Sequence, residues 1–358
     1  MNAKRKFVDS VVTCLSWSGL PSLLRQFQHE EFCILMLHGI TKLKPSEQSG
    51  IGNAEGIHMH VRDFEAICKL LSAHYRVISL REAVQKLERK EALPTGSVVL
   101  TFDDGYRSNK ELALPLLEEY NLPATVFLAT DFVENGSWQW WDRVEYALGH
   151  TEQEGLELSI GGTLVDQKLE TRAMRREAFF SLLPLIKALP QEDVNDVVGH
   201  LEKRLGCSLN TAAKIPEMYL PLSWEMVREM QAGGLVEFGA HTHTHKILGR
   251  CKLPTVREEL VTSRDLLSER AGIEEPLFSY PNGHIGDHTR ETRREVIDLG
   301  FSCALTTETG FNNIHSDVYT LKRFSTGNSS NYVDVTASGT MRMLIAMNNA
   351  IRGNERVA

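Results

Sequence analysis

The stretch from Ser97 to Gly105 reads Ser-Val-Val-Leu-Thr-Phe-Asp-Asp-Gly, and it guides the interpretation of the whole chain. A short apolar run bounded by turn residues predicts a buried strand. This strand ends in two adjacent carboxylates, Asp103 and Asp104. Because neighbouring residues of an extended strand point to opposite sides, the two carboxylates can serve different purposes. Asp-Asp-Gly is also a common turn, since Asp tolerates turn geometry and Gly supplies a positive φ.

A second polar cluster lies far downstream, where the apolar run 235–239 is followed by His-Thr-His-Thr-His at positions 241–245. His241 and His245, together with one aspartate, offer three ligands for one divalent ion and leave a carboxylate spare. Catalytic zinc sites commonly use three protein ligands and an open position. Zinc is the leading candidate, although cobalt, nickel, manganese and iron accept the same ligands. Each cluster alone is typical of a turn or an exposed strip, but together they predict a metal-assisted hydrolase.

Other short apolar runs alternate with helical patterns, which is typical of an α/β fold with mainly parallel strands. Capping patterns predict helices that begin at Ser79, Ser108 and Thr255. Pro115 should bend or shorten the second of these helices. Strands are expected at residues 32–37, 76–78, 98–102, 124–129, 236–239, 277–280 and 301–305.

The alternation breaks after the 124–129 strand, and we predict a mostly helical insertion over residues 132–221. We expect it to project from the catalytic side, where it could narrow a cleft. A tryptophan cluster lies near its start. Aromatic faces suit sugar stacking, but these side chains are equally expected to pin the insertion to the barrel. The cluster consists of Trp138, Trp140 and Trp141, of which Trp140 is our candidate substrate contact.

Composition excludes some classes of partner. The net charge is −8 and no long basic run occurs, which argues against nucleic acid as a partner. Six scattered cysteines without Cys-x-x-Cys spacing favour a reducing compartment, so we predict a cytoplasmic location. No stretch reaches the roughly eighteen apolar residues of a membrane span.

The first 30 residues resemble a signal peptide only superficially. Lys4-Arg5-Lys6 precedes an apolar region, but Asp9 and Ser10 interrupt that region and no cleavage site is clear. We predict an amphipathic helix that lies on the protein or touches a membrane surface. The expected organisation is therefore an N-terminal segment (1–30), a catalytic domain (31–330) interrupted by the insertion (132–221), and a helical tail (331–358) with an amphipathic helix at 341–351.

Both polar clusters resemble motifs of the NodB-homology polysaccharide deacetylases, carbohydrate esterase family 4. Residues 101–106 are similar to the first family motif, Thr-Phe-Asp-Asp-Gly. His241-Thr-x-x-His245 is similar to the second motif, His-Ser/Thr-x-x-His. The resemblance implies that Asp103 is the general base, while Asp104, His241 and His245 bind the metal.

The resemblance covers roughly residues 32–325 and implies an irregular (β/α) barrel of about seven strands. Thr242 would then orient the ligands through hydrogen bonds outside the coordination shell. His243 falls on a variable position of the motif, so we do not expect it to bind the ion.

The third family motif, Arg-x-Pro, is altered in this chain. Phe278–Gly283 reads Phe-Ser-Tyr-Pro-Asn-Gly and is similar to a variant found in a bacterial branch concerned with surface polysaccharides. Ser279 stands where an arginine normally holds the catalytic aspartate. Arg323 is our candidate replacement; an ordinary surface arginine is the alternative. The candidate substrate contacts are Tyr280, Pro281 and Asn282, with a backbone N–H near Tyr280 assisting a developing oxyanion.

The catalytic acid is not where the family usually places it. The family supplies a histidine from a late Leu-x-His segment, and no such triplet occurs between Phe301 and Phe324. His38 ends the 32–37 strand, so it would open onto the same rim as Asp103. Its Leu-His-Gly segment also resembles the Tyr-His-x of the same bacterial branch. We favour His38 over His315, which lies in a polar loop.

These features predict a metal-dependent N-deacetylase. Its substrate would be an N-acetylated carbohydrate, namely the N-acetylhexosamine units of a bacterial surface polysaccharide or its precursor. Two alternatives remain: a hydrolase of another carbon–nitrogen amide bond on the same fold, and a catalytically silent polysaccharide-binding module.

Overall fold

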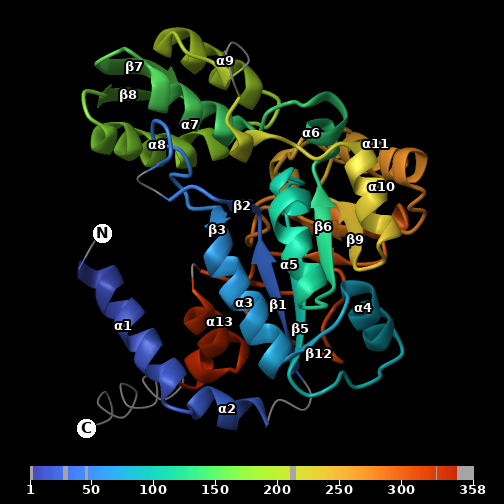
Figure 1. Cartoon of the computed structure of the whole chain (residues 1–358). Coiled ribbons are helices and arrows are strands. Elements are labelled where there is room, and N and C mark those ends of the chain that lie inside the picture. The colour runs from blue at the N-terminus through green and yellow to red at the C-terminus, as the bar shows by residue number, and fades with distance from the viewer. Residues whose placement is uncertain (1–2, 27–30, 45–46, 210–214, 328, 345–358) are drawn as a thin grey trace, which may run out of the picture.

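The computed structural model describes residues 3–26, 31–44, 47–209, 215–327 and 329–344. A curled, mostly parallel sheet forms the centre of the molecule, and helices cover its outer face (Figure 1). The strands are β1 (Glu31–Leu37), β2 (Gly39–Thr41), β3 (His58–His60), β4 (Arg76–Val77), β5 (Ser97–Phe102), β6 (Ala124–Leu128), β7 (Gly155–Ile160), β8 (Thr163–Lys168), β9 (Val236–Ala240), β10 (Leu277–Ser279), β11 (Ala304–Leu305), β12 (Asn312–Asn313) and β13 (Phe324–Ser325).

The helices alternate with these strands over most of the chain. They are α1 (Ala3–Trp17), α2 (Leu20–Arg25), α3 (Val61–His74), α4 (Leu80–Glu88), α5 (Leu114–Glu119), α6 (Thr130–Asn135), α7 (Trp140–His150), α8 (Arg172–Lys187), α9 (Val194–Leu205), α10 (Trp224–Ala232), α11 (Leu253–Ala271), α12 (Arg290–Asp298) and α13 (Ser330–Ala337). Short turns of other helix types occur at η1 (Asn109–Ala113), η3 (Glu217–Tyr219) and η4 (Leu248–Arg250).

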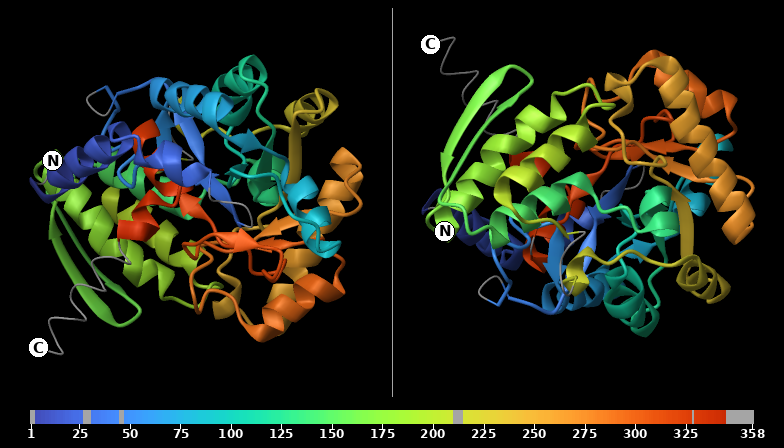
Figure 2. Two further views of the ribbon diagram at one scale, coloured as in Figure 1. Left: turned by 90° about the horizontal axis from the view of Figure 1, so that it is seen from below. Right: turned by 90° about the horizontal axis from the view of Figure 1, so that it is seen from above.

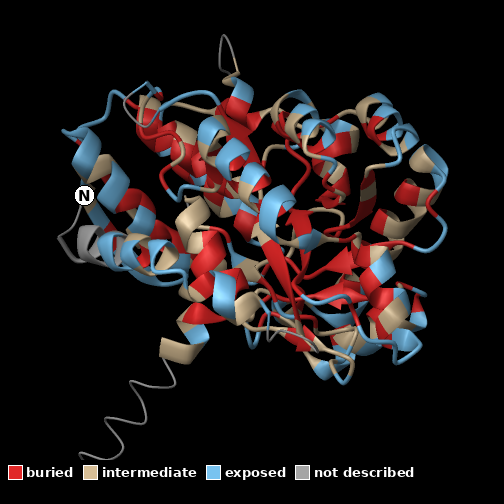
Figure 3. Cartoon of the chain, turned by 60° about the horizontal axis from the view of Figure 1, so that its bottom comes forward, coloured by how far each residue is buried: buried red, intermediate tan, exposed pale blue. Residues whose placement is uncertain are grey.

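The main sheet has the order β11-β10-β9-β6-β5-β1-β12, with β13 beside β1 and β4 beside β5. Its pairings are parallel except that of β1 with β12. Each of the seven predicted strands is present, and the predicted irregular (β/α) barrel is confirmed as a curled half-barrel. Parallel strands are covered on both faces, which explains why every residue of β5 is buried (Figure 3).

Helical structure begins at Ser79 and Ser108 as predicted, but not at Thr255, and only Ser79 caps its helix with its side chain. Ser79 does cap α4, accepting a hydrogen bond from the backbone N–H of Glu82 at 3.0 Å. Ser108 instead accepts from the Ile40 backbone N–H at 2.9 Å, so a tertiary contact uses its hydroxyl. Thr255 lies inside α11, which begins at Leu253.

Most of the segment between β6 and β9 builds a separate layer over the carboxyl ends of the strands, whereas its last helix, α10, packs beside β9 (Figure 1). The layer contains α6 to α9 and the antiparallel β7–β8 hairpin. In the view from above, its green helices cover part of the upper end of the barrel (Figure 2). Its apolar side chains form a cluster of their own, which also takes in Ile51 and Ala54 from the loop after β2. The boundaries 132–221 stay a prediction.

Helix α1 and the following Arg25 contact α13 at the opposite side of the barrel (Figure 1). Ser16 of α1 donates to Asp334 of α13 at 3.4 Å, and Arg25 pairs with the same carboxylate. Helix α1 therefore lies against the protein. Among the described helices, none combines the length and apolar character needed to cross a bilayer. The predicted tail helix at 341–351 falls largely outside the described residues.

Candidate active site

The Asp-Asp-Gly motif is both a turn and the presentation of two carboxylates. The backbone N–H of Asp103 still donates to Leu37 at 2.9 Å, which continues the ladder between β1 and β5. The chain then turns with φ of 75° at Asp104 and 89° at Gly105. Glycine is required at position 105 because a Cβ there would lie 2.7 Å from the Leu128 side chain. Both carboxylates end up at most 2% exposed.

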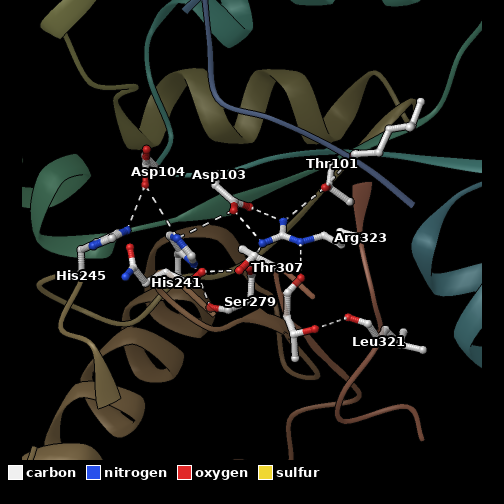
Figure 4. A network of polar contacts seen from close by, with 12 residues as sticks. Thr101, Asp103, Asp104, His241, His245, Ser279, Thr307, Leu321 and Arg323 are labelled. Carbon is white, nitrogen blue, oxygen red and sulfur yellow. Dashed lines mark hydrogen bonds and ion pairs between the residues drawn. The ribbon is translucent and has the colours of Figure 1, made fainter. Parts of the chain in front are cut away.

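Asp104, His241 and His245 converge on one point. Their candidate ligand atoms all lie within 4.8 Å of one another. Oδ1 of Asp104 is 3.3 Å from Nε2 of His245 and 3.7 Å from Nε2 of His241 (Figure 4). Neither oxygen of the buried Asp104 carboxylate has a hydrogen-bond partner among the described residues. A buried anion is costly unless a cation balances it, so this trio fits a divalent ion that accepts oxygen and nitrogen ligands.

The imidazole of His241 is prepared for metal binding by its surroundings. Nδ1 lies 2.8 Å from the backbone oxygen of Ser279, so it carries the proton and donates it to that carbonyl. Nε2 is therefore left as the electron-pair donor that faces Asp104. Burial lowers the pKa of His241 to about 4, which keeps the ring neutral as a ligand must be.

Arg323 holds Asp103 in the manner predicted for the replaced family arginine. Its Nη1 and Nη2 each lie 2.8 Å from a different oxygen of the Asp103 carboxylate, which forms a two-pronged pair. Nη2 also donates to the Ser279 hydroxyl at 2.9 Å, and Nε donates to the Thr306 carbonyl at 2.9 Å. The Arg323 side chain is fully buried, so the alternative of a surface arginine is wrong.

This pair sets the charge of the candidate base. Burial, the largest single influence, would raise the pKa of Asp103, but the charge and hydrogen bonds of Arg323, together with the charges of His241 and His38, hold that pKa well below its ordinary value. Asp103 therefore stays ionised. Ser279 leaves room for the guanidinium and hydrogen-bonds to it, which is how a serine can stand at the usual arginine position.

Glu259 of α11 anchors the histidine loop, a role that the sequence did not reveal. Its buried carboxylate accepts the backbone N–H groups of His243 at 2.9 Å and Thr244 at 2.7 Å. It also accepts from Lys246 at 3.0 Å. The loop needs such support because two of its residues, Thr242 and His245, have φ near 60°. A glutamate in an ordinary helical pattern gives no local signal of this role.

The structure does not give Thr242 the predicted orienting hydrogen bond. Its hydroxyl is buried without a partner among the described residues, and only its carbonyl is engaged, by the Thr130 N–H at 3.2 Å. The Ser279 carbonyl performs the orienting role for His241. As expected, His243 is outside the ligand trio; its Nδ1 lies 2.9 Å from the Thr130 hydroxyl.

His38 opens onto the same cavity as the carboxylates. This cleft has a volume of about 330 Å³ and is lined by Asp103, Asp104, His241 and His245 as well as His38. His315 is exposed in its loop and does not line the cleft. Of the two candidate acids, the structure therefore places only His38 beside Asp103.

The three candidate substrate contacts in the Phe-Ser-Tyr-Pro-Asn-Gly segment differ in whether they reach the cleft. Asn282 lines the cleft, whereas Pro281 is buried outside its lining. Tyr280 is 0% exposed and packs edge-on against Phe278 at 5.1 Å, so its assignment as a side-chain substrate contact is corrected. Successive strand residues alternate between faces, so Ser279 faces Arg323 and Tyr280 faces the core. The Tyr280 N–H already donates to Leu305 at 3.0 Å.

The tryptophans combine the two roles that the sequence left open. Trp140 and Trp141 both line the cleft, and Trp140 is partly exposed. Trp141 is mostly buried, lies edge-on to His245 at 4.5 Å between ring centres, and donates to the Tyr106 hydroxyl at 3.2 Å. Trp138 lies edge-on to Phe132. The cleft wall also includes residues with no signal in the sequence, namely Glu55, Lys187, His284 and Thr307.

Comparison with known proteins shows the family of the chain. The family model described as polysaccharide deacetylase matches residues 90–167 and 187–304, which is more than half of the chain. The chain belongs to the polysaccharide deacetylase family. The matched parts contain both motifs, and the unmatched stretch between them falls mainly on α8 of the additional layer.

A curated member of the polysaccharide deacetylase family, the putative polysaccharide deacetylase YxkH of Bacillus subtilis (strain 168), is 32% identical over 96 residues. This alignment covers 26% of the chain and 30% of the length of that relative.

Solved structures of deacetylases share the fold. The Streptococcus pyogenes deacetylase PplD, in complex with acetate, superposes with a TM-score of 0.55 at 17% identity, covering 86% of this chain and 99% of that one. IcaB from Ammonifex degensii gives a TM-score of 0.55 at 19% identity, and the superposition covers 87% of this chain and 98% of that one. The de-N-acetylase from Aggregatibacter actinomycetemcomitans gives a TM-score of 0.52 at 14% identity, covering 84% of this chain and 96% of that one. At these identities the likeness shows the fold alone.

Proposed function

We propose that this protein is a metal-dependent N-deacetylase that hydrolyses the acetamide of N-acetylhexosamine units in a bacterial surface polysaccharide or its precursor. The observation that carries the proposal is the arrangement in one cleft of a carboxylate held by a buried guanidinium beside a buried Asp-His-His trio. Membership of the family supports the reaction class.

The ion would be held by Asp104, His241 and His245, with zinc the first candidate. When bound, a divalent ion at such a site polarises an acyl oxygen and lowers the pKa of water. The orphaned oxygens of Asp104 and the neutral state of His241 support this assignment.

Asp103 is the proposed general base. Water adds to the acetamide carbon while Asp103 accepts a proton from that water, and the carbon–nitrogen bond then breaks to give acetate and an amine. Arg323 orients both Asp103 oxygens, which limits the motion of the base during this transfer. His38 is the proposed acid, because it lines the same cleft and the departing nitrogen must be protonated.

Acetate release from N-acetylglucosamine oligomers tests the proposal. The wild-type protein loaded with Zn²⁺ should release acetate, and Asp103→Asn should bind the ion while losing hydrolysis. Full activity of Asp103→Asn would overturn the role of this residue. A panel of linear and cyclic amides, run beside the sugars, separates the deacetylase from another carbon–nitrogen hydrolase, which remains the second candidate on this fold.

The silent binding module is less well supported than the enzyme. Two departures from the family motifs motivate it, namely the serine at position 279 and the missing Leu-x-His segment. Arg323 supplies the positive charge beside Ser279, and His38 lines the cleft in place of the missing histidine. Binding of an oligomer to the metal-loaded protein without acetate release would nevertheless favour it.

A reducing compartment is part of the proposal. All six cysteines are free, and three of them, Cys33, Cys68 and Cys303, are buried as small apolar side chains. Fractionation of cells that express the protein, followed by thiol labelling, tests the proposed cytoplasmic location.

A further inference from the structure

The proposed acid lies at a break between two strands. His38 follows the end of β1 and precedes the start of β2, and these two strands belong to different sheets. Strand β1 pairs with β5 and β13, whereas β2 pairs with β3. Contacts beyond the strand pairings are therefore needed to fix the backbone at His38.

The chain segment that follows the proposed base supplies such contacts. Nδ2 of Asn109 donates to the His38 carbonyl at 2.7 Å. One residue earlier, the Ser108 hydroxyl accepts from the Ile40 backbone N–H at 2.9 Å. Ser108 and Asn109 follow Asp103 closely in the sequence, so the segment that carries the base also holds the backbone of the acid.

Asn109 is itself firmly placed. It is 1% exposed and begins η1, a π-helical turn in which the Leu114 N–H donates to the Asn109 carbonyl. Single π-helical turns are rare and occur frequently at functional sites. Oδ1 of Asn109 is buried without a hydrogen-bond partner among the described residues. An unsatisfied buried acceptor costs free energy, which points to a role for this amide beyond filling space.

The backbone next to His38 is also closely packed. A Cβ at Gly39 would overlap the imidazole of His58, which is 3% exposed. Only glycine leaves room for this ring, so the chain beside the acid has little freedom to shift. Such placement matters for the reaction, because displacing a reacting group by about 1 Å costs on the order of 10²-fold in rate.

We propose that Asn109 is a positioning residue for the reaction: it fixes His38 in the place from which the imidazole protonates the departing amine. This inference rests on the proposed function and deepens it, because it makes the base and the acid parts of one rigid unit. Asn109 does not line the cleft, so it acts through His38 and not on the substrate.

Two leaving groups separate this role from a merely structural one. An amine must be protonated as the carbon–nitrogen bond breaks, whereas 4-nitrophenolate leaves 4-nitrophenyl acetate without a proton. In the Zn²⁺-loaded protein, Asn109→Ala should lower kcat for an N-acetylglucosamine tetramer about 10- to 100-fold, with KM little changed. Hydrolysis of 4-nitrophenyl acetate, which still needs Asp103, should stay close to that of the wild type.

Two further variants control for a loss of folding. Asn109→Leu keeps the branched shape of the side chain without its donor, and it should show the same selective loss while urea unfolding confirms the fold. Thr151→Val is the matched control, because Thr151 is 3% exposed and its hydroxyl donates to the Leu205 carbonyl at 2.6 Å within the additional layer. It should leave the ratio of amide to ester hydrolysis unchanged.

A double-variant cycle completes the test. His38→Ala should show the same selective loss, and His38→Ala/Asn109→Ala should be no slower than His38→Ala alone. Multiplied losses in the double variant, or equal losses on both substrates in His38→Ala, Asn109→Ala or Asn109→Leu, would overturn the positioning role while leaving the deacetylase intact. Absence of acetate release from the sugar by the wild type would overturn the proposed function itself.

Discussion

Replacing Arg323 with methionine should impair both the stability and the reaction of this protein. Methionine keeps the unbranched stem of the side chain but removes the guanidinium group, and with it the charge and all five donors. The Asp103 carboxylate would then remain in a site where it is about 3% exposed, without its cation. We therefore expect the Asp103 pKa to rise, because burial is no longer opposed by the guanidinium.

The magnitude follows from the burial of both partners. Breaking a buried ion pair by removing one partner costs about 3–5 kcal/mol, because the other charge is left uncompensated. An exposed pair provides the contrast: Arg293 and Asp317 are 2.7 Å apart, with side chains 36% and 42% exposed. Such pairs contribute about 0–1 kcal/mol, so Arg293→Met is the matched control. For catalysis, a base displaced by about 1 Å costs on the order of 10²-fold in rate.

The pH dependence has a defined sign. In the wild type the Asp103 pKa is depressed, so its contribution to stability is present above the unfolded value and is lost as the pH falls through the folded value. In Arg323→Met the raised pKa leaves the base protonated up to a higher pH. The acidic limb of the kcat/KM profile should therefore move to higher pH.

The assays are urea unfolding and the pH profile of acetate release. Arg323→Lys should retain part of the stability but lose the two-pronged geometry. The double variant Ser279→Arg/Arg323→Ser, which restores the arginine to its usual family position, should recover activity relative to Arg323→Ser alone. Wild-type stability together with an unshifted acidic limb in Arg323→Met would refute the reasoning.

Three further predictions concern neighbouring groups. Glu259→Ala should lower the affinity for the metal about 10- to 100-fold in a chelator competition assay, and Glu259→Gln should restore part of it. Unchanged metal affinity in Glu259→Ala would show that Glu259 does not support the histidine loop. Asp104→Asn should raise the melting temperature of the metal-free protein, because a buried charge without a partner is removed. Zn²⁺ at 100 times its Kd should stabilise the wild type by about 2.7 kcal/mol and should not stabilise this variant. A Zn²⁺-induced rise in melting temperature as large as that of the wild type would contradict the ligand assignment. Burial, followed by the charge of Glu145, raises the Asp142 pKa well above its ordinary value, so the associated stability is present below the unfolded pKa and is lost as the pH rises through the folded one. Asp142→Asn should therefore be more stable than the wild type at pH 8 and equal to it near pH 4 in thermal unfolding, and lower stability at both values would be the contrary result.

Local sequence predicted those parts of the site that lie at strand ends. The run into Asp103 and the run before His241 each specified a strand and its terminal side chains, because burial pattern and turn chemistry act over a few residues. The capping roles of the helix-starting residues were predicted less well. The Ser108 hydroxyl bonds to Ile40 instead of its own helix, a choice that only the tertiary contact makes.

The sequence also could not assign faces where a strand is short. Tyr280 was predicted to contact the substrate, next to Ser279 at the position of the usual arginine. Packing against Phe278 turned Tyr280 into the core and left Ser279 beside Arg323. The orientation of these two side chains depends on which face of β10 packs against the helices, and no local sequence pattern predicts that face.

By itself, the sequence determined the α/β class and the two polar clusters at strand ends, because these depend on residue type and short spacing; the assignment of a ligand trio came from the resemblance to the family. The tertiary structure alone decided what surrounds them. Arg323 reaches Asp103 across 220 positions because β13 pairs with β1 beside β5. Likewise, Glu259 and Trp140 take their places at the site because α11 packs beside β9 and the additional layer covers the strand ends. Charge pairing and cavity shape depend on distances in space, which the order of residues does not contain.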